Sequence, residues 1–230
     1  MAHMPPPPLT CVLFDFAWTL FAGDPDTWVR GAAQAIGRPV ADGEPAAISA
    51  AYMDRLRTTA TDPAHLARDL DPSVYDAAIS VVLTGIPGVT PDFAAALAAT
   101  HMTSLAPYAD VASTFKTLKT LGVRIGVVSN IGCDLRPAFT RNGLDGFVDA
   151  FVLSYEVGFV KPDPAIWKAA LHALRADPAE TVMVGDHPAG DGGAVVAGIA
   201  ALVLPQVASP LEPRGLDHVV ALVHGRARKS

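Results

Sequence analysis

The feature that most constrains the fold of this chain is the alternation of short, almost wholly apolar runs with helical segments. Five such runs are expected to form strands, over residues 11–14, 123–128, 147–153, 181–184 and 200–204. Runs without a polar face suit strands that are buried on both sides, as in parallel sheets covered by helices. Repeated in this order, they predict an α/β fold with a doubly wound parallel sheet.

Helix-end signals between the runs support this order. Asp110 is expected to cap a helix that stops at Gly122, and Asp163 with Pro164 is expected to open another helix. Aspartate is favoured at the N-cap, proline in the first turn and glycine just past the end. The connections between several predicted strands are therefore helical.

Residues 23–105 interrupt this alternation. The segment is rich in alanine, with turn signals around Gly37, Pro63, Pro72 and Gly88, so we expect an inserted α-helical cap domain. The α/β core is then expected over 9–22 and 106–230. Residues 1–8 are expected to be a tag remnant, Met-Ala-His-Met, followed by a proline-rich lead-in.

Charge and composition exclude several classes of protein. Half of the residues are apolar, 17% are charged and the net charge is -6, which argues against a disordered chain and against a nucleic-acid partner. The longest uncharged stretch, 192–211, is interrupted by Gly198, Pro205 and Pro210, so no membrane span is expected. With only two cysteines and no signal peptide, the expected location is cytoplasmic, as a monomer or homodimer.

Polar residues follow the predicted strands at points that a parallel sheet brings together. Asp15, Ser129 and Asp186 each follow an apolar run, and Lys161 comes shortly after the third run. Ligands of open α/β sheets bind at the carboxyl ends of the strands. An aspartate at one strand end could be a simple helix cap, but these four side chains together indicate a ligand site at one edge of the sheet.

These residues lie in motifs that, in this order, resemble those of the haloacid dehalogenase superfamily. The matching segments are VLFDFAWTL at 12–20, VVSN at 127–130, KPDP at 161–164 and VGDHPAGD at 184–191. The resemblance extends from Leu9 to about Pro205, and the predicted insertion falls where this family carries a helical cap.

The resemblance implies catalytic roles for four positions. Asp15 would be the nucleophile that accepts a phosphoryl group, and Thr19 would fix the turn that follows it. Ser129 would donate a hydrogen bond to the phosphoryl oxygens, and Lys161 would neutralise their charge. Phosphoryl transfer depends mainly on such positioning and charge neutralisation.

The resemblance also implies a Mg²⁺ site and a place for the substrate. The ion would be held by Asp15, by the backbone carbonyl of Ala17 and by Asp186, with Asp191 either in the metal shell or orienting the lysine. Candidate substrate contacts, adjacent to the site or in the cap, are Asn130, Trp18 and Arg30.

Two positions depart from the family pattern. Ala17 stands where the family has a second aspartate, which protonates the leaving group and then activates water. Loss of a general acid/base costs about 10²- to 10⁴-fold in rate. Trp18 stands where a glycine is usual, so it is expected to restrict the backbone and add a large ring beside the pocket. His187 is a weaker candidate for a substitute proton carrier.

The sequence therefore predicts a Mg²⁺-dependent hydrolase that removes phosphate from a small phosphorylated metabolite through an aspartyl-phosphate. One alternative is a catalytically impaired binding or regulatory protein, favoured by Ala17 and Trp18. Another is a 2-haloacid dehalogenase-type hydrolase, which also lacks the second aspartate but has no metal-type Gly-Asp pair such as Gly185 and Asp186. The phosphonoacetaldehyde hydrolases resemble this chain in having alanine at the position of Ala17, but they depend on a cap lysine. Residues 23–105 contain no lysine, so that activity is not expected.

Overall fold

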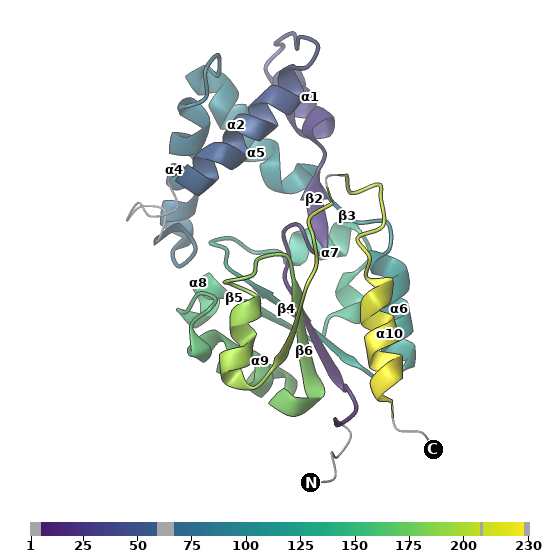
Figure 1. Ribbon diagram of the computed structural model, residues 1–230. Helices are drawn as coiled ribbons and strands as arrows, with labels where there is room; N and C mark the ends of the chain where they lie inside the picture. Colours follow the sequence, from purple (N-terminus) through teal and green to yellow (C-terminus); the bar gives the residue numbers. More distant parts are fainter. Residues whose placement is uncertain (1–5, 59–66, 208, 228–230) are drawn as a thin grey trace.

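The computed structural model describes residues 6–58, 67–207 and 209–227, so the expected tag remnant at 1–4 lies outside the described residues. An α/β core carries a helical insertion above the upper edge of its sheet in Figure 1. No helix of the described residues has the length and apolar character needed to span a bilayer.

The five predicted strands form one parallel sheet, with bounds that differ from the expected ones by a few residues. Its strands stand in the order β5-β4-β1-β6-β7. They are β1 (Cys11–Phe14), β4 (Arg124–Ser129), β5 (Ala150–Leu153), β6 (Thr181–Gly185) and β7 (Ala200–Val203). The chain winds outward from β1 through β4 to β5 and then returns to β6, so the order reverses beside β1. This switch point is where α/β sheets place their ligands.

Helices cover both faces of the sheet, as the apolar runs predict. Val12 and Phe14 pack into a cluster with Val111 and Phe115 of α6 (Val111–Thr120) and with α10 (Asp217–Arg226). On the other face, Leu13 packs in a cluster with α9 (Pro164–Leu174) and the 3₁₀ helix η3 (Gly192–Ala197). Alternate β1 side chains thus lie in two separate apolar layers.

Both aspartates stand at the N-cap of the predicted helix, but only Asp163 makes the side-chain capping bond. The Asp163 side chain accepts from the Ala165 N–H at the start of α9. Asp110 makes no such bond to α6. Its carboxylate instead accepts three backbone N–H bonds, each 2.9 Å long, from residues 214–216 ahead of α10. That tertiary contact satisfies both oxygens and joins two distant segments, which no local pattern indicates.

The insertion has its own apolar core. It comprises α1 (Pro25–Ala35), α2 (Glu44–Thr58), α4 (Pro72–Thr84) and α5 (Pro91–Ser104). Trp28, Val29, Phe93 and Leu97 lie in its apolar cluster. A two-stranded antiparallel ribbon of β2 (Phe21–Gly23) and β3 (Leu105–Pro107) connects it to the core. The ribbon was not predicted, because three residues are too few for an apolar pattern.

Short helices complete the sheet edge that faces the insertion. They are α7 (Arg136–Arg141), which follows β4, and α8 (Ser154–Val157), which follows β5 directly. Phe139 of α7 packs, with tilted or edge-to-face rings, within an aromatic group that includes Phe16, Phe21 and Phe151. This packing fixes the backbone just beyond Asp15.

Candidate active site

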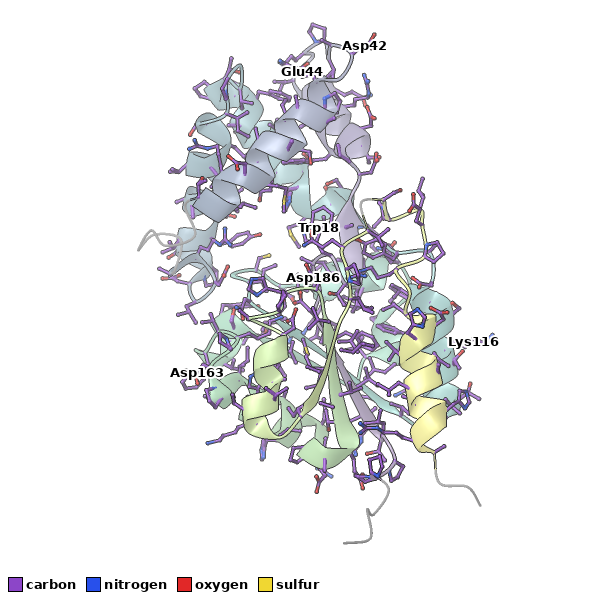
Figure 2. All side chains as sticks on the ribbon, viewed as in Figure 1. Trp18, Asp42, Glu44, Lys116, Asp163 and Asp186 are labelled. Atoms are coloured by element: carbon purple, nitrogen blue, oxygen red, sulfur yellow. The ribbon has the colours of Figure 1, made fainter. Side chains whose placement is uncertain are left out.

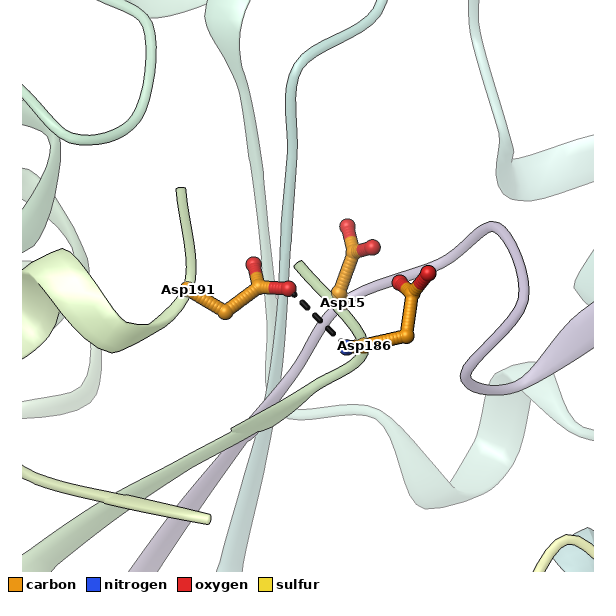
Figure 3. Close-up of side chains that lie close together, drawn as sticks. All are labelled: Asp15, Asp186 and Asp191. Atoms are coloured by element: carbon orange, nitrogen blue, oxygen red, sulfur yellow. Dashed lines mark hydrogen bonds between the residues drawn. The ribbon is translucent and has the colours of Figure 1, made fainter. Parts of the chain in front are cut away.

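The carboxyl edge of the sheet brings together the strand-end residues that the sequence singles out. Asp15 follows β1, Ser129 ends β4 and Asp186 follows β6. Carboxylate oxygens of Asp15, Asp186 and Asp191 lie within 4.8 Å of one another, and Figure 3 shows the three side chains around one point. The predicted convergence is therefore present in the structure.

Lys161 lies between two of these carboxylates. Its Nζ donates to Asp15 Oδ1 at 2.7 Å and to Asp191 Oδ1 at 2.6 Å. The side chains of Lys161 and Asp191 are only 5% and 1% exposed. Burial lowers the pKa of Lys161, but the negative charges of Asp15 and Asp191 raise it by more than burial lowers it. The net shift of the pKa is therefore upward. The ammonium is therefore a fixed positive charge beside Asp15.

The Asp15 carboxyl is held in a strongly perturbed environment. Burial raises its pKa to about 7, Lys161 lowers it, and Asp191 raises it. A second cation near this oxygen pair would lower the pKa and favour the carboxylate. A nucleophilic carboxylate at this position thus depends on the positive charge around it.

Asn130 positions the lysine. Its Oδ1 accepts from the Lys161 N–H at 2.7 Å, and its Nδ2 donates to the Lys161 carbonyl at 3.0 Å. Both ends of the amide thus hold the lysine backbone. Asn130 was expected to contact the substrate. It does line the pocket described below, but its amide is engaged in this positioning role.

Asp191 orients the lysine and the loop after β6. Besides Lys161, it accepts at Oδ2 from the backbone N–H groups of Asp186 (3.1 Å) and His187 (2.9 Å). A Cβ at Gly185 would lie 2.1 Å from this Oδ2, so only glycine leaves room for the carboxylate. Because both oxygens are already engaged, the structure favours the lysine-orienting role over direct metal ligation.

Asp186 presents a carboxylate beside Asp15 and suits a magnesium site. Thr19 Oγ1 donates to its Oδ1 at 3.4 Å, and Gln206 Nε2 donates to its Oδ2 at 2.6 Å. Mg²⁺ is bound through one or two carboxylates with several waters retained. Asp15 and Asp186 supply such hard oxygen ligands, so the residues fit this ion. Sequence reasoning missed Gln206, which lies after β7 and outside every motif.

Replacing Asp186 is expected to weaken Mg²⁺ binding. Asp186→Ala removes one of the two carboxylates, so the dissociation constant measured by titration calorimetry should rise by about 10- to 100-fold or more. Asp76→Ala, at an exposed position of α4, removes the same charge outside the cluster of Asp15, Asp186 and Asp191 and should bind Mg²⁺ as the wild type does. Equal binding by both variants would contradict this ligand assignment.

Trp18 occupies a left-handed backbone conformation. Its φ is +58°, in the region that glycine adopts most easily, which explains why glycine is common at this position. Its N–H donates to the Phe21 carbonyl at 2.7 Å, and its carbonyl accepts from Arg214 Nε at 2.6 Å. Arg214 is 3% exposed and also donates to the Pro205 and Leu204 carbonyls. This buried arginine, unpredicted from sequence, holds the turn in place.

A cavity of about 180 Å³ lies between the core and the insertion. Its core side includes Ala17, Trp18 and Asn130, the residues beside Asp15 and Ser129. Figure 2 shows Trp18 between the insertion and the core, above Asp186. The insertion contributes mainly apolar and aromatic side chains, among them Trp28, Tyr52, Met53, Leu56, Tyr75, Ile79 and Met102. Its polar contributions include Arg68, Asp69 and His101. The expected contact of Trp18 with a pocket thus fits the structure.

Arg30, the third predicted substrate contact, lies away from this cavity. It is exposed on α1 and pairs with Asp26 one turn earlier, at 2.7 Å. The same helix buries Trp28, Val29 and Ala32 on its inner side. Helical periodicity places residue 30 on the opposite face. The expectation that Arg30 reaches the substrate is therefore wrong.

His187 is also not placed for proton transfer in the cavity. Its side chain is exposed, and its Nδ1 accepts from the Gly190 N–H at 2.8 Å. It does not line the cavity among the described residues. The structure thus gives it a role in shaping the loop.

His101 makes the stability of the insertion sensitive to pH. It packs edge to face against Trp28 and Tyr52, and burial lowers its pKa from 6.5 to about 4. The unfolded chain therefore binds a proton between these values while the folded chain does not. Stability should fall by up to about 2 kcal/mol as the pH drops from 7 to 5. Urea unfolding at both pH values should show His101→Phe losing this increment, whereas His172→Phe, at an exposed site on α9, keeps it.

Comparison with known proteins places these features in a family. The family described as haloacid dehalogenase-like hydrolase matches residues 9–198. A glyceraldehyde 3-phosphate phosphatase from Methanothermobacter thermautotrophicus is 38% identical over 118 residues, which are 50% of this chain and 50% of that protein. The alignment thus spans about half the length of this relative.

Solved structures match over most of the chain. L-2-haloacid dehalogenase from Xanthobacter autotrophicus has a TM-score of 0.66 at 24% identity and covers 85% of this chain and 77% of its own. The HAD-hydrolase YfnB from Bacillus subtilis, bound to magnesium, has a TM-score of 0.70 at 17% identity, covering 94% and 99% respectively. At these identities the likeness concerns the fold, a parallel sheet with a helical insertion.

Proposed function

The chain belongs to the haloacid dehalogenase-like hydrolases, and on this premise we propose that it is a Mg²⁺-dependent phosphatase of small phosphorylated metabolites. The observation that carries the proposal is the Lys161 ammonium, buried between Asp15 and Asp191 at the edge of the sheet. We take residues 23–105 as the cap and 9–22 with 106–230 as the catalytic core.

Each residue of the proposed mechanism has a position that suits its role. An Asp15 oxygen forms a bond to phosphorus while the bond to the leaving oxygen breaks, giving an aspartyl-phosphate. Ser129 and Lys161 stabilise the phosphoryl oxygens, and water then releases inorganic phosphate. Bound Mg²⁺, held by Asp15, Asp186 and the Ala17 carbonyl, would neutralise negative charge on the phosphoryl group.

The lining of the cavity suits a phosphate ester whose organic part is largely apolar. Trp28 and Tyr52 meet edge to face in its wall, with ring centroids 5.1 Å apart. The aromatic and aliphatic side chains around them outnumber the polar ones. Such walls favour an aromatic or aliphatic group over a highly hydroxylated one. The related phosphatase acts on glyceraldehyde 3-phosphate by name, and this chain shares the phosphate chemistry rather than that substrate.

Two alternatives fit the observations less well. Burying the charges of Asp15, Lys161 and Asp191 carries a desolvation penalty in the free energy of folding. Turnover explains why these three charges are packed together, whereas binding alone does not. A dehalogenase mechanism needs no metal, whereas Asp186 offers a carboxylate next to Asp15. Both features support the phosphatase.

A screen of phosphate monoesters with Mg²⁺ tests the proposal. The panel should include aryl, alkyl and hydroxylated esters, as well as a 2-haloacid, and should report released phosphate or halide. The wild type is expected to release phosphate, most efficiently from esters with an apolar organic group. Asp15→Asn keeps the shape of the side chain without the nucleophile and should lose all turnover. Release of halide alone, or phosphate release that persists in Asp15→Asn, would overturn the proposal.

A further inference from the structure

We propose that the carboxyl group of Asp69, in the insertion, is the general acid and base of the reaction, in place of the carboxyl group that Ala17 lacks. This inference rests on the proposed phosphatase function. It assigns the proton-transfer role to the segment just ahead of α4, and five features of the site support it.

The main chain of Asp69 is bonded to the core beside the catalytic strand ends. The Ser154 Oγ donates to the Asp69 carbonyl, and the same Oγ accepts from the Ile131 N–H at 2.8 Å. Ser154 is fully buried at the start of α8, and Ile131 comes two residues after Ser129. This arrangement fixes Asp69 over the edge where the phosphoryl group would lie.

A glycine in the core permits this approach. A Cβ at Gly132 would lie 2.0 Å from the Arg68 carbonyl oxygen and 2.9 Å from the Tyr75 Cβ. Any other residue at 132 would push the insertion away from the core at this point. The close contact at Gly132 and the Ser154 bond place residues 68 and 69 against the loop that follows β4. This second contact between the insertion and the core is remote in sequence from the β2–β3 ribbon.

The direction of the reaction points the leaving oxygen toward Asp69. In an in-line displacement the leaving oxygen lies on the side of phosphorus opposite the attacking Asp15 oxygen. Asp15 sits in the sheet edge, so the leaving group extends outward into the cavity. Asp69 lines that cavity together with Ala17 and Asn130.

Among the described residues that line the cavity, Asp69 is the only one with a carboxyl group, the kind of group that Ala17 lacks. Burial raises the pKa of Tyr52 to about 12 and that of Tyr75 well above 10, and it lowers the pKa of His101 to about 4. Arginine remains charged. Burial raises the pKa of Asp69, while Arg68 and Lys161 lower it.

Arg68 orients the acid. Its Nε donates to Asp69 Oδ1 at 3.0 Å, and the two side chains are 22% and 20% exposed. One oxygen is thus held by the guanidinium, which leaves Oδ2 as the atom that carries the proton.

The proposed proton transfers balance over one turnover. Protonated Asp69 gives its proton to the leaving oxygen as the phosphorus–oxygen bond breaks and the bond to Asp15 forms. The Asp69 carboxylate then takes a proton from the water that attacks the aspartyl-phosphate. Inorganic phosphate leaves, Asp15 is again a carboxylate and Asp69 is again protonated.

The test compares leaving groups in Asp69→Asn, which has nearly the same shape. An alkyl phosphate needs a proton on its leaving oxygen, so kcat/KM should fall by about 10²- to 10⁴-fold. 4-Nitrophenyl phosphate has a stable phenolate as leaving group, so its kcat/KM should fall by less than about tenfold. Retained activity on this ester also demonstrates that the variant folds. Asp76→Asn, an exposed charge removal on α4, should match the wild type on both esters.

A second measurement examines the return of the proton. Without the base, water attack slows, so Asp69→Asn should release a burst of 4-nitrophenol equal to the enzyme concentration and accumulate a phosphorylated protein detected by mass. Equal losses on both esters, or an unchanged alkyl rate, would overturn the inference while leaving the phosphatase function intact. A wild type that hydrolyses neither ester would overturn the phosphatase proposal itself.

Discussion

Lys161→Met is expected to reduce kcat by about 10²- to 10³-fold, one of the largest losses outside the nucleophile itself. The ammonium contacts Asp15 at 2.7 Å and Asp191 at 2.6 Å. Methionine is unbranched and one atom shorter than lysine, so it keeps most of the side chain and removes the charge. A phosphoryl group would then face two buried carboxylates with one cation fewer, and removal of one such electrostatic contact typically costs 10²- to 10³-fold. The Asp15 carboxyl would also hold its proton more tightly. Initial rates with 4-nitrophenyl phosphate measure the loss.

The same variant should be unstable in a pH-dependent way. Breaking a buried ion pair by removing one partner costs about 3–5 kcal/mol. Burial already raises the pKa of Asp15 to about 7, and loss of Lys161 raises it further. A folded-state pKa above the unfolded value means that the folded protein binds the proton more tightly. Stability should therefore decline as the pH rises, and the loss relative to wild type should be larger at pH 8 than at pH 5. Urea unfolding without Mg²⁺ measures it.

Lys119→Met provides the matched control. Lys119 Nζ pairs with Asp149 at 2.7 Å, but both side chains are 34% exposed. An exposed pair is worth about 0–1 kcal/mol, so this variant should lose little stability at either pH and no activity. Similar losses in the two lysine variants would mean that the buried triad has no special role.

The parallel sheet and the edge that holds the site could be predicted because local patterns encode them. An apolar run such as residues 11–14 can be buried only inside a covered sheet, and each parallel strand brings its carboxyl end to the same edge. Asp15, Ser129 and Asp186 therefore lie at one edge of the sheet, as expected. The magnesium ligands, the nucleophile and the cap limits stay predictions, and Asp186→Ala and Asp15→Asn test the first two.

The residues that sequence reasoning missed act through tertiary contacts. Gln206 reaches Asp186, and Arg214 reaches the Trp18 carbonyl across 196 positions in the chain. Asp69 lies in a turn between helices, where an aspartate commonly serves as a cap, and only its contact with Ser154 distinguishes it. Arg30 shows the converse error. A position near the nucleophile loop in sequence lies on the outer face of α1, because helix rotation decides where the side chain points.

Ala17→Asp, added to Asp69→Asn, is expected to restore the activity on alkyl phosphates that Asp69→Asn loses. The Ala17 side chain is exposed at the cavity wall, so a carboxyl group there can approach the same leaving oxygen from the core side. In the double variant, kcat/KM for an alkyl phosphate should rise by about 10²- to 10⁴-fold over Asp69→Asn, which corresponds to about 3–5.5 kcal/mol of barrier. The burst of 4-nitrophenol should disappear, because the new carboxylate also activates water.

The background in which Ala17→Asp acts identifies the natural acid. If Asp69 already transfers the proton, the gain in the wild type should be far smaller than the gain in Asp69→Asn. If Ala17 is instead an uncompensated defect, the wild type itself should gain about 10²- to 10⁴-fold on alkyl esters, and Asp69 would then not be the acid. The Trp18 ring, held in a left-handed turn with φ of +58°, lies beside the new carboxyl group. The triple variant Ala17→Asp, Trp18→Gly, Asp69→Asn therefore tests whether the ring keeps a carboxyl group at position 17 away from the leaving oxygen. If activity returns only when Trp18→Gly is added, the ring blocks that carboxyl group. In the wild type, the proton would then reach the leaving oxygen only from the cap.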